Sequence, residues 1–169
     1  VIPSKISVTG LQRILQNLVG ERVSIRDLPT ILEGVAEGSA FSNNITAITE
    51  HVRGRLSRQL CDQHSGKGGI LPLVTLSGEW EQSFAEALVG NGDDKQLAMA
   101  PSRLQQFIQV IRSTYEDLAM KGENPVLLTS PAIRPYVRSI IERFRPQTIV
   151  MSQNEIHPRA KIRTFAQIT

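Results

Sequence analysis

Three groups of residues in this sequence have types and spacings that could do chemistry. Gly66, Lys67, Gly68 and Gly69 look like part of a phosphate-binding loop, in which backbone N–H groups and a lysine hold phosphate oxygens. That motif requires a glycine where Cys61 stands, and it requires serine or threonine, not Gly68, directly after the lysine. The spacing therefore favours a linker over a nucleotide site.

The second and third groups would serve a metal ion or a catalytic triad. Cys61 and His64 are spaced like metal ligands, but a structural zinc site needs about four such side chains. The chain has only two other histidines. Ser152, Glu155 and His157 are the residue types of a hydrolase triad, yet no glycine-flanked nucleophile turn surrounds any serine. We therefore predict no enzyme, no metal and no cofactor.

Arginines offer a different chemistry, the docking of an acidic partner. The stretch Pro125–Ile156 reads as a β-prone run, a helix with an apolar stripe, and a second β-prone run. The polar face of that helix would carry Arg134, Arg138 and Arg145. Guanidinium groups bind carboxylates in a fixed fork geometry. This face is therefore a candidate partner site, and a merely solvated face is the alternative.

The charge distribution points to the same part of the chain. The net charge is only +3, but residues 126–169 contain seven basic and two acidic residues. Such a segment could attract nucleic acid, acidic protein or anionic lipid. With five Phe, two Tyr and one Trp available for base stacking, nucleic acid is not favoured. Trp80 is either an exposed partner anchor or a core residue, and the core is favoured.

The first third of the sequence has a helical pattern. Helices are expected at about 8–20, 27–38 and 44–60, and their candidate N-caps are Ser7 or Thr9, Asp27, and Asn44 or Thr46. Three short helices would make a small bundle with apolar residues inside. The polar edge of this bundle is expected to face a neighbouring subunit, and its residues are Arg22, Arg26, Asp27, Arg53 and Arg58.

A glycine-rich segment separates this bundle from the rest of the chain. Gly66, Gly68 and Gly69 predict a hinge, because glycines leave the backbone costly to order. After it, strands are expected at 70–76, 97–99, 126–129, 148–151 and 161–168, and helices at 77–89, 101–122 and 130–145. Pro72 would place the first strand at an edge.

The predicted fold class is therefore α+β or α/β. A small N-terminal helical bundle, residues 1–66, precedes a compact α/β module with a short mixed sheet, residues 67–169. The 169 residues, 40% of them hydrophobic, are enough to bury a core. No run of about 18 apolar residues predicts a membrane span, and the single Cys61 is compatible with a reducing compartment. Because the chain begins at Val1 rather than Met, we expect a fragment.

Two long stretches carry a resemblance to a known family. VSIRDLPTILEGVAE follows a helix that contains LQRILQNLV, and PVLLTSPAIRPYVRSIIERF comes before SQNEI much later in the chain. In this order and spacing they resemble the C-terminal cytoplasmic part of the FlhA/InvA/LcrD (FHIPEP) export-gate family, and most of all its flagellar members. The resemblance spans nearly the whole chain.

The resemblance implies a membrane-integral protein on the bacterial inner membrane, whose N-terminal membrane part is absent from this chain. It also implies a cytoplasmic part of four subdomains assembled into a ring, with residues 1–66 as the third and 67–169 as the fourth. In the family the ring receives export substrates and their chaperones, and the third subdomain contributes to contacts between protomers. The best-described chaperone cleft lies between the first two subdomains, so no residue here inherits that role.

The function expected from the sequence is ring assembly and docking in a flagellar type III export gate, which is a non-enzymatic role. Expected partners are export substrates, substrate–chaperone complexes and other export components. The same module of a virulence injectisome is an alternative, since it would show much the same pattern. A rival from another class is an α/β enzyme that binds a phosphorylated small molecule at a helix N-terminus such as Ser130.

Overall fold

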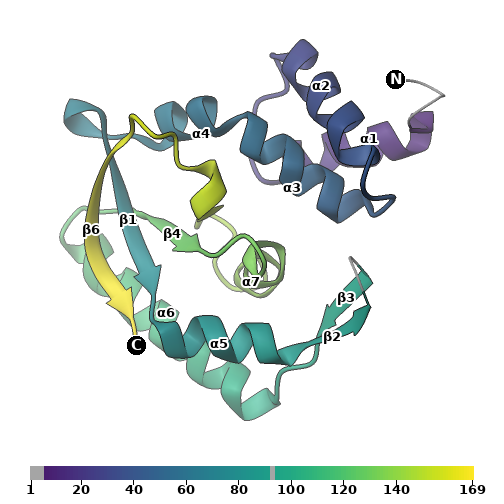
Figure 1. The fold of residues 1–169 in the computed structure, drawn as a ribbon. Coiled ribbons are helices and arrows are strands. Elements are labelled where there is room, and N and C mark those ends of the chain that lie inside the picture. The colour runs from purple at the N-terminus through teal and green to yellow at the C-terminus, as the bar shows by residue number, and fades with distance from the viewer. Residues whose placement is uncertain (1–5, 92–93) are drawn as a thin grey trace.

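The computed structural model describes residues 6–91 and 94–169 and places a parallel β-sheet between two groups of helices (Figure 1). The first group contains α1 (Val8–Gly20), α2 (Leu28–Ser39), α3 (Ile45–Arg55) and α4 (Ser57–His64). The second contains α5 (Gly78–Ala87), α6 (Pro101–Met120) and α7 (Arg134–Ile141). The fold is thus of the mixed α and β class that the sequence predicts.

The helix starts in the first group follow the predicted capping chemistry. The Ser7 hydroxyl accepts a hydrogen bond from the Gly10 N–H at 3.0 Å, and the Asp27 carboxylate accepts one from the Thr30 N–H at 3.3 Å. The side chain of Asn44 caps α3 in the same way. Each bond satisfies a backbone donor that the first helical turn leaves without a partner.

The third predicted helix is wrong in its continuity. Leu56, with φ −96° and ψ 17°, interrupts it, so that α3 ends at Arg55 and α4 begins at Ser57. Four helices therefore occupy the described part of the first segment, not three. The break turns α4 toward the sheet, where Leu60 and Cys61 are buried.

The main sheet is parallel, with the strand order β5-β4-β1-β6. Its strands are β1 (Ile70–Leu76), β4 (Val126–Thr129), β5 (Val150–Ser152) and β6 (Lys161–Ile168). A separate antiparallel hairpin consists of β2 (Leu88–Asn91) and β3 (Asp94–Leu97). Both strand orientations are present, but they lie in two sheets and not in one mixed sheet. The predicted β-strand, helix, β-strand unit is confirmed as β4, α7 and β5.

The prediction that Pro72 puts the first strand at an edge is wrong, since β1 lies between β4 and β6. Proline is tolerated here because β1 pairs with β4 only from Leu73 onward. On that side no ladder hydrogen bond is lost at Pro72. The edge strands are β5 and β6, and the register of β6 against β1 shifts so that Phe165 has no partner residue. Ile162 is exposed, although the predicted alternation put it on a buried face, and residues 161–164 are exposed on both faces of the strand.

The sheet is a middle layer shared by both predicted segments. Leu71 and Leu73 of β1 pack with the apolar residues of α1–α4, whereas Val74 and Leu76, on the other face, pack with α5, α6 and α7. This alternation is the period of a strand buried on both faces. The division at residues 66 and 67 stays a prediction, and one hydrophobic cluster crosses it.

The glycines between α4 and β1 form a tight turn, η1 (Lys67–Gly69). The Gly66 N–H donates to the Ile70 carbonyl at 2.9 Å, and the Gly69 N–H donates to the Gly66 carbonyl at 3.1 Å. Gly68 and Gly69 have φ values of 71° and 70°, which favour glycine. The turn geometry is sufficient reason for these residues, and a hinge motion remains a prediction.

Candidate inter-subunit and docking surfaces

The arginine face predicted for the helix after Ser130 does not point to solvent. The helix begins at Arg134, with Pro135 in its first turn, and Arg134 is only 1% exposed. Its guanidinium holds the carboxylate of Glu50 at 2.7 and 2.8 Å and that of Glu21 at 2.8 Å twice. It also donates to the Val150 carbonyl at 3.0 Å. Every N–H of this guanidinium is therefore engaged inside the protein.

Arg53, predicted at an inter-subunit edge, is also buried and is 1% exposed. Its Nε and Nη2 atoms donate to the two carboxylate oxygens of Glu155 at 3.1 and 2.8 Å. Glu155 belongs to the short helix η2 (Gln153–Glu155), and the Ser152 hydroxyl also bonds to it, at 3.3 Å. Because Arg53 occupies Glu155, and His157 binds the Cys61 sulfur through its backbone N–H, these residues do not form a triad.

Arg138 completes the group, and we call Glu21, Glu50, Arg53, Arg134, Arg138 and Glu155 the Arg–Glu cluster. Arg138 donates to the Thr148 carbonyl at 3.0 Å, and its Nε lies 3.6 Å from a Glu21 oxygen. Three positive charges face three negative ones. The cluster ties α3 and the end of α1 to α7 and η2, which are far apart in sequence. Its arginines are buried in this conformation, and among their buried donor atoms only Arg53 Nη1 and Arg138 Nε lack a hydrogen-bond partner within the described residues.

The cluster affects the ionisation of its carboxylates in different directions: at Glu50 burial outweighs the charge and hydrogen bonds of Arg134, so the pKa of Glu50 is raised. Burial alone disfavours the charged carboxylate of Glu21, but the hydrogen bonds and the charge of Arg134 outweigh it, so the pKa of Glu21 is lowered. Burial likewise disfavours a charged Arg134, but Glu50 and Glu21 raise the pKa of Arg134 further above its ordinary value. Both groups are therefore ionised at neutral pH.

Two further predicted partner residues have internal roles. Trp80 is buried, as favoured from the sequence, and its indole N–H donates to the Thr169 carbonyl at 3.1 Å. The Arg103 guanidinium lies over its ring, 3.8 Å from the centroid. Arg145 is half-buried, donates to the Thr148 hydroxyl at 2.9 Å, and lies 4.9 Å from the Tyr115 ring. Neither side chain is a free anchor.

The other predicted inter-subunit residues are exposed. Arg22, Arg26 and Asp27 lie on the loop between α1 and α2, and Arg58 lies on the adjacent α4. Two glutamines of α4 hold this loop: Gln59 donates to the Ser24 carbonyl at 3.0 Å, and Gln63 donates to the Arg22 carbonyl at 2.8 Å. Arg26, Asp27 and Arg58 also line one hollow of about 800 Å³. The structure thus gathers four of the five residues on one polar surface.

Beside this loop lies an apolar groove that the sequence reading did not identify. It runs along the outer side of α1, has a volume of about 660 Å³, and is lined by Val8, Leu11, Gln12, Leu15, Gln16, Val19, Gly20 and Ile25. Val8 is 68% exposed and Val19 is 55% exposed. The sequence does carry a signal for this groove, because the apolar stripe of α1 is wider than packing against the core alone requires. Ile14 and Leu18 enter the core, whereas Val8, Leu11, Leu15 and Val19 form a second row.

No three His, Cys, Asp or Glu side chains within 6–91 and 94–169 are grouped so that they could hold a metal ion. Within the same ranges, no helix combines the length and the apolar character needed to cross a bilayer.

The fold is that of the cytosolic domains of type III secretion proteins. The C-terminal domain of InvA superimposes with a TM-score of 0.88 at 27% identity, over 97% of this chain and 50% of that one. The EPEC SctV-C protein, solved as a nonamer, gives 0.85 and 27% over 97% and 49%. CdsV of Chlamydia pneumoniae, solved in complex with CdsO, gives 0.85 and 29% over 97% and 48%.

The chain belongs to the FHIPEP family, whose model matches residues 1–161. The flagellar biosynthesis protein FlhA of Caulobacter vibrioides is 60% identical over 99% of this chain and 24% of its own length. The low calcium response locus protein D of Yersinia pestis is 31% identical over 95% of this chain and 23% of its own length. The family recognised from the two sequence stretches is thereby confirmed. The chain spans about a quarter of the length of these relatives.

Proposed function

We propose that this chain is part of the cytoplasmic portion of a flagellar type III export gate at the bacterial inner membrane. It serves there as a ring-assembly and docking platform for export substrates, chaperones and other export components. The single observation that carries the proposal is the open groove on α1, bordered by the charged loop 22–27. An exposed apolar patch with a polar rim is typical of a protein–protein interface.

Similar proteins support both parts of this proposal. A related domain was solved as a nonamer, and another was solved with a second protein bound. The flagellar assignment rests on the higher identity to flagellar FlhA, 60%, against 31% for the low calcium response locus protein D. In this proposal residues 1–66 are the third cytoplasmic subdomain and residues 67–169 are the fourth. The turn at Gly66, Gly68 and Gly69 is the hinge about which the two subdomains change their relative orientation.

The structure does not support the alternative function, an enzyme that binds a phosphorylated small molecule at Ser130. The backbone N–H of Ser130, which would receive a phosphate, donates instead to the Glu81 carboxylate at 3.0 Å. Residues 131–133 form a turn before α7, so Ser130 is not the cap of that helix. An anionic ligand would meet a carboxylate already in place, and no second candidate function is favoured.

Ring assembly is tested with Val19→Glu in the protein that includes its upstream half. Val19 is exposed, so the variant folds, but a charge in the centre of the groove must be desolvated when a neighbouring protomer covers it. We expect at least a tenfold loss of assembly, about 1.4 kcal/mol or more, measured by light scattering and sedimentation velocity. Val89→Glu on β2, 51% exposed, is the matched control and should assemble normally. Normal rings from Val19→Glu would refute the proposal.

A further inference from the structure

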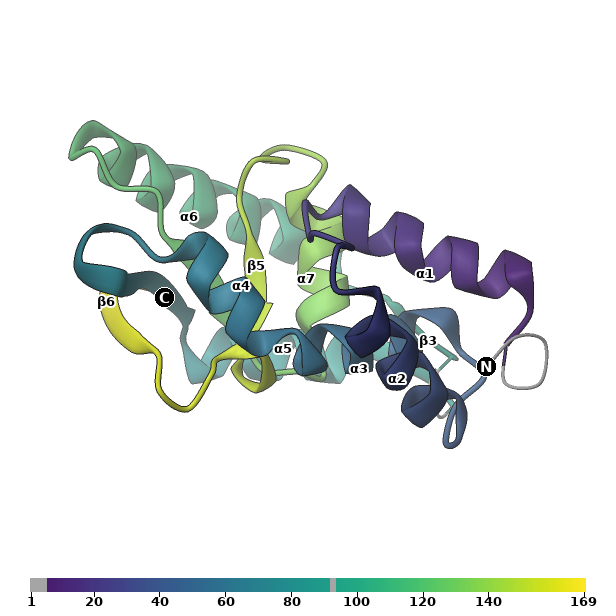
Figure 2. The same cartoon turned by 90° about the horizontal axis from the view of Figure 1, so that it is seen from above.

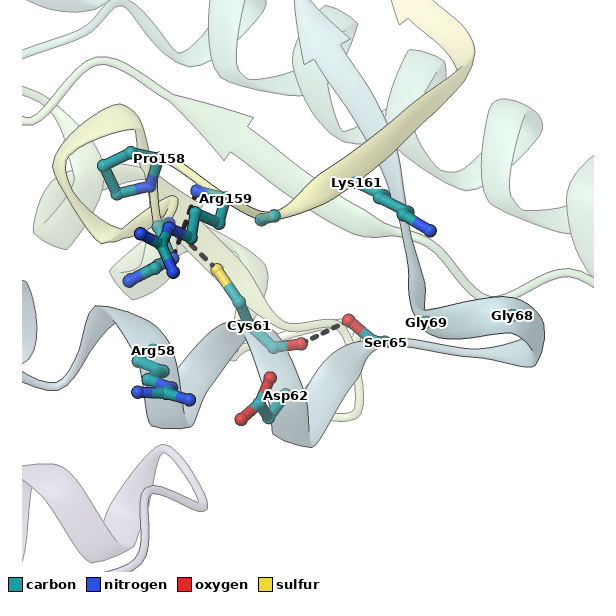
Figure 3. A pocket seen from close by; sticks show the side chains of 11 residues that line it. Arg58, Cys61, Asp62, Ser65, Gly68, Gly69, Pro158, Arg159 and Lys161 are labelled. Atoms are coloured by element: carbon teal, nitrogen blue, oxygen red, sulfur yellow. Dashed lines mark hydrogen bonds between the residues drawn. The ribbon is translucent and has the colours of Figure 1, made fainter.

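A second charged hollow lies on the other side of Arg58 and Asp62, which it shares with the hollow beside the loop 22–27. It has a volume of about 550 Å³ and lies where α4 faces the chain that leads into β6 (Figure 3). Arg58, Arg159 and Lys161 line it, with Asp62 as the one acidic residue. The ion pairs between described residues involve none of these three cations. The hollow therefore carries positive charge that the rest of the described chain does not neutralise.

The walls of this hollow are fixed by hydrogen bonds. The Cys61 thiol donates to the Glu155 carbonyl at 3.3 Å and accepts from the His157 N–H at 3.2 Å. The Arg159 N–H donates to His157 Nδ1 at 3.1 Å, and the Ala160 N–H donates to the His157 carbonyl at 2.9 Å. The turn that carries Arg159 is therefore held against α4. Basic side chains on a fixed backbone lose less entropy when they bind an anion.

An open strand edge begins at the same place. β6 starts at Lys161, is one of the two edge strands of the sheet, and pairs only with β1. Residues 161–164 are exposed on both faces of the strand, and Ile162 is 53% exposed. The outer edge of this half-strand offers backbone N–H and C=O groups to which an extended chain can add.

We propose that the hollow and this edge together bind an extended acidic segment of a partner protein. The segment adds as a further strand beside β6 and places one acidic side chain near Lys161 and another near Arg58 and Arg159, which lie farther along the hollow. Side chains two apart lie on the same face of a strand, so Lys161 and Arg163 share one face and Ile162 lies on the other. The matching segment therefore alternates acidic residues with β-branched apolar ones.

Two simpler explanations cover only part of these observations. Charged side chains on an edge strand prevent aggregation, which would explain Lys161 and Arg163 but not the cationic hollow beside them. An anionic lipid surface would attract the cations, but it would not use a strand edge or a concave site. The proposal rests on the docking function proposed above and names the chemistry of one partner.

The test uses this chain and a labelled peptide of about six residues, a usual strand length, that alternates glutamate and valine. Binding is followed by fluorescence anisotropy, and it should weaken with added salt, as expected for exposed charges. Lys161→Glu and Arg163→Glu should each weaken binding about tenfold. Arg13→Glu on α1, which lies at the opposite end of the molecule from β6 (Figure 2), is the matched control and should bind normally. Equal affinity in all three variants would overturn the proposal.

Strand addition is tested separately from charge. Methylating every second peptide amide removes either the donors that face β6 or those that face away. One methylated series should therefore lose binding and the other should keep it. A peptide of equal charge with a central proline should bind poorly, and equal binding would refute the strand geometry. If the protein sediments with phosphatidylglycerol vesicles but does not bind the peptide, the proposal is wrong and the cations contact a membrane instead. Because no ring is needed here, failure of ring assembly would leave these results unaffected.

Discussion

At the scale of single residues, the Arg–Glu cluster decides which arginines can meet other proteins. Arg53 and Arg55 are two positions apart on α3, yet Arg53 is buried against Glu155 while Arg55 pairs with Glu33 at 2.8 Å in contact with solvent. Helical periodicity shows that the two face different ways. It does not show that the inward one is neutralised by a glutamate about a hundred residues later, because that contact exists only in the folded sheet.

Because Arg53 is buried and Arg55 is exposed, replacing each by methionine should lower the stability of the fold by different amounts. Arg53→Met removes the two-fold partner of buried Glu155, which among the described residues keeps only the Ser152 hydroxyl and the more distant Arg134, and should lower the free energy of unfolding by about 3–5 kcal/mol. Arg55→Met removes two exposed pairs, with Glu33 and Glu37, and should cost about 1 kcal/mol or less. Urea unfolding followed by circular dichroism measures both values. Equal small losses would mean that the cluster does not stabilise the fold.

Glu21 provides a prediction for pH. Its pKa is lowered in the folded state, so its ionised form contributes stability above the ordinary value of 4.5, and this contribution is lost as the pH falls through the lowered pKa. Glu21→Gln should therefore cost about 1.5–3 kcal/mol at neutral pH, the value of charged hydrogen bonds, and progressively less in acid. The comparison is made by urea titrations across the acid range.

The exposed Glu33 is the control for this pH experiment. Its carboxylate pairs only with the exposed Arg55 among the described residues, so Glu33→Gln should change stability little at any pH. If Glu21→Gln were equally destabilising in acid and at neutral pH, the stabilisation would not come from its charge.

At the scale of elements, much was predictable. The strand 70–76, the strand 126–129 and the capping residues Ser7, Asp27 and Asn44 follow from local rules that need no tertiary contact. The failures came from tertiary context. Leu56 breaks a helix in which the nearby Gly54 is the one local signal, and the bulge at Phe165 shifts the register of β6. Packing of α4 on the sheet and pairing with β1 decide these features, and neither contact is visible in the local sequence.

The structure gives a packing reason for a glycine inside the helix α2. By helix propensity alone Gly34 weakens α2, but a Cβ there would lie 3.3 Å from the Cα of Val52 on α3. α2 and α3 therefore approach each other closely at this glycine. This packing role cannot be predicted from sequence periodicity, because the sequence does not show which helix lies beside the glycine.

Alanine substitutions distinguish a packing glycine from an ordinary one. Gly34→Ala should lower stability, because backbone atoms of α3 must move away from the added methyl group. Gly54→Ala, within α3 and with no atom within 4 Å of its Cβ position, should raise stability by about 0.5–1 kcal/mol. Thermal unfolding of both variants checks this. A stabilising Gly34→Ala would mean that α2 and α3 are not packed this closely.

At the scale of the whole molecule, the two predicted segments share a sheet face and the Arg–Glu cluster. Ile14, Ile31 and Leu60 of the first helices contact the same hydrophobic cluster as Leu73 and Met151 of the sheet. From the sequence alone, a glycine-rich turn between a helical pattern and an α/β pattern predicts a boundary between two subdomains. The sequence could not show that the chain on both sides of it is held together by apolar and ionic contacts.

The shared core predicts that both segments unfold together. Trp80, the single tryptophan, lies in the α/β segment and reports on it alone by fluorescence. Ile31→Ala in α2 removes fully buried methyl groups and should cost about 2–5 kcal/mol. We expect the Trp80 transition to shift to lower urea concentration by the same free energy as the circular dichroism transition. A Trp80 transition that does not move would show that the segments unfold independently.

Glu21 is the residue that ends α1 as well as a member of the Arg–Glu cluster. The helix that displays the groove on its outer side is therefore anchored at that end by charges on its inner side. If the chain assembles into the ring proposed above, a genetic screen for defective rings would for this reason recover substitutions of these buried residues as well as of the surface. Suppressors of such alleles would be sought among their buried ionic partners rather than across the subunit boundary.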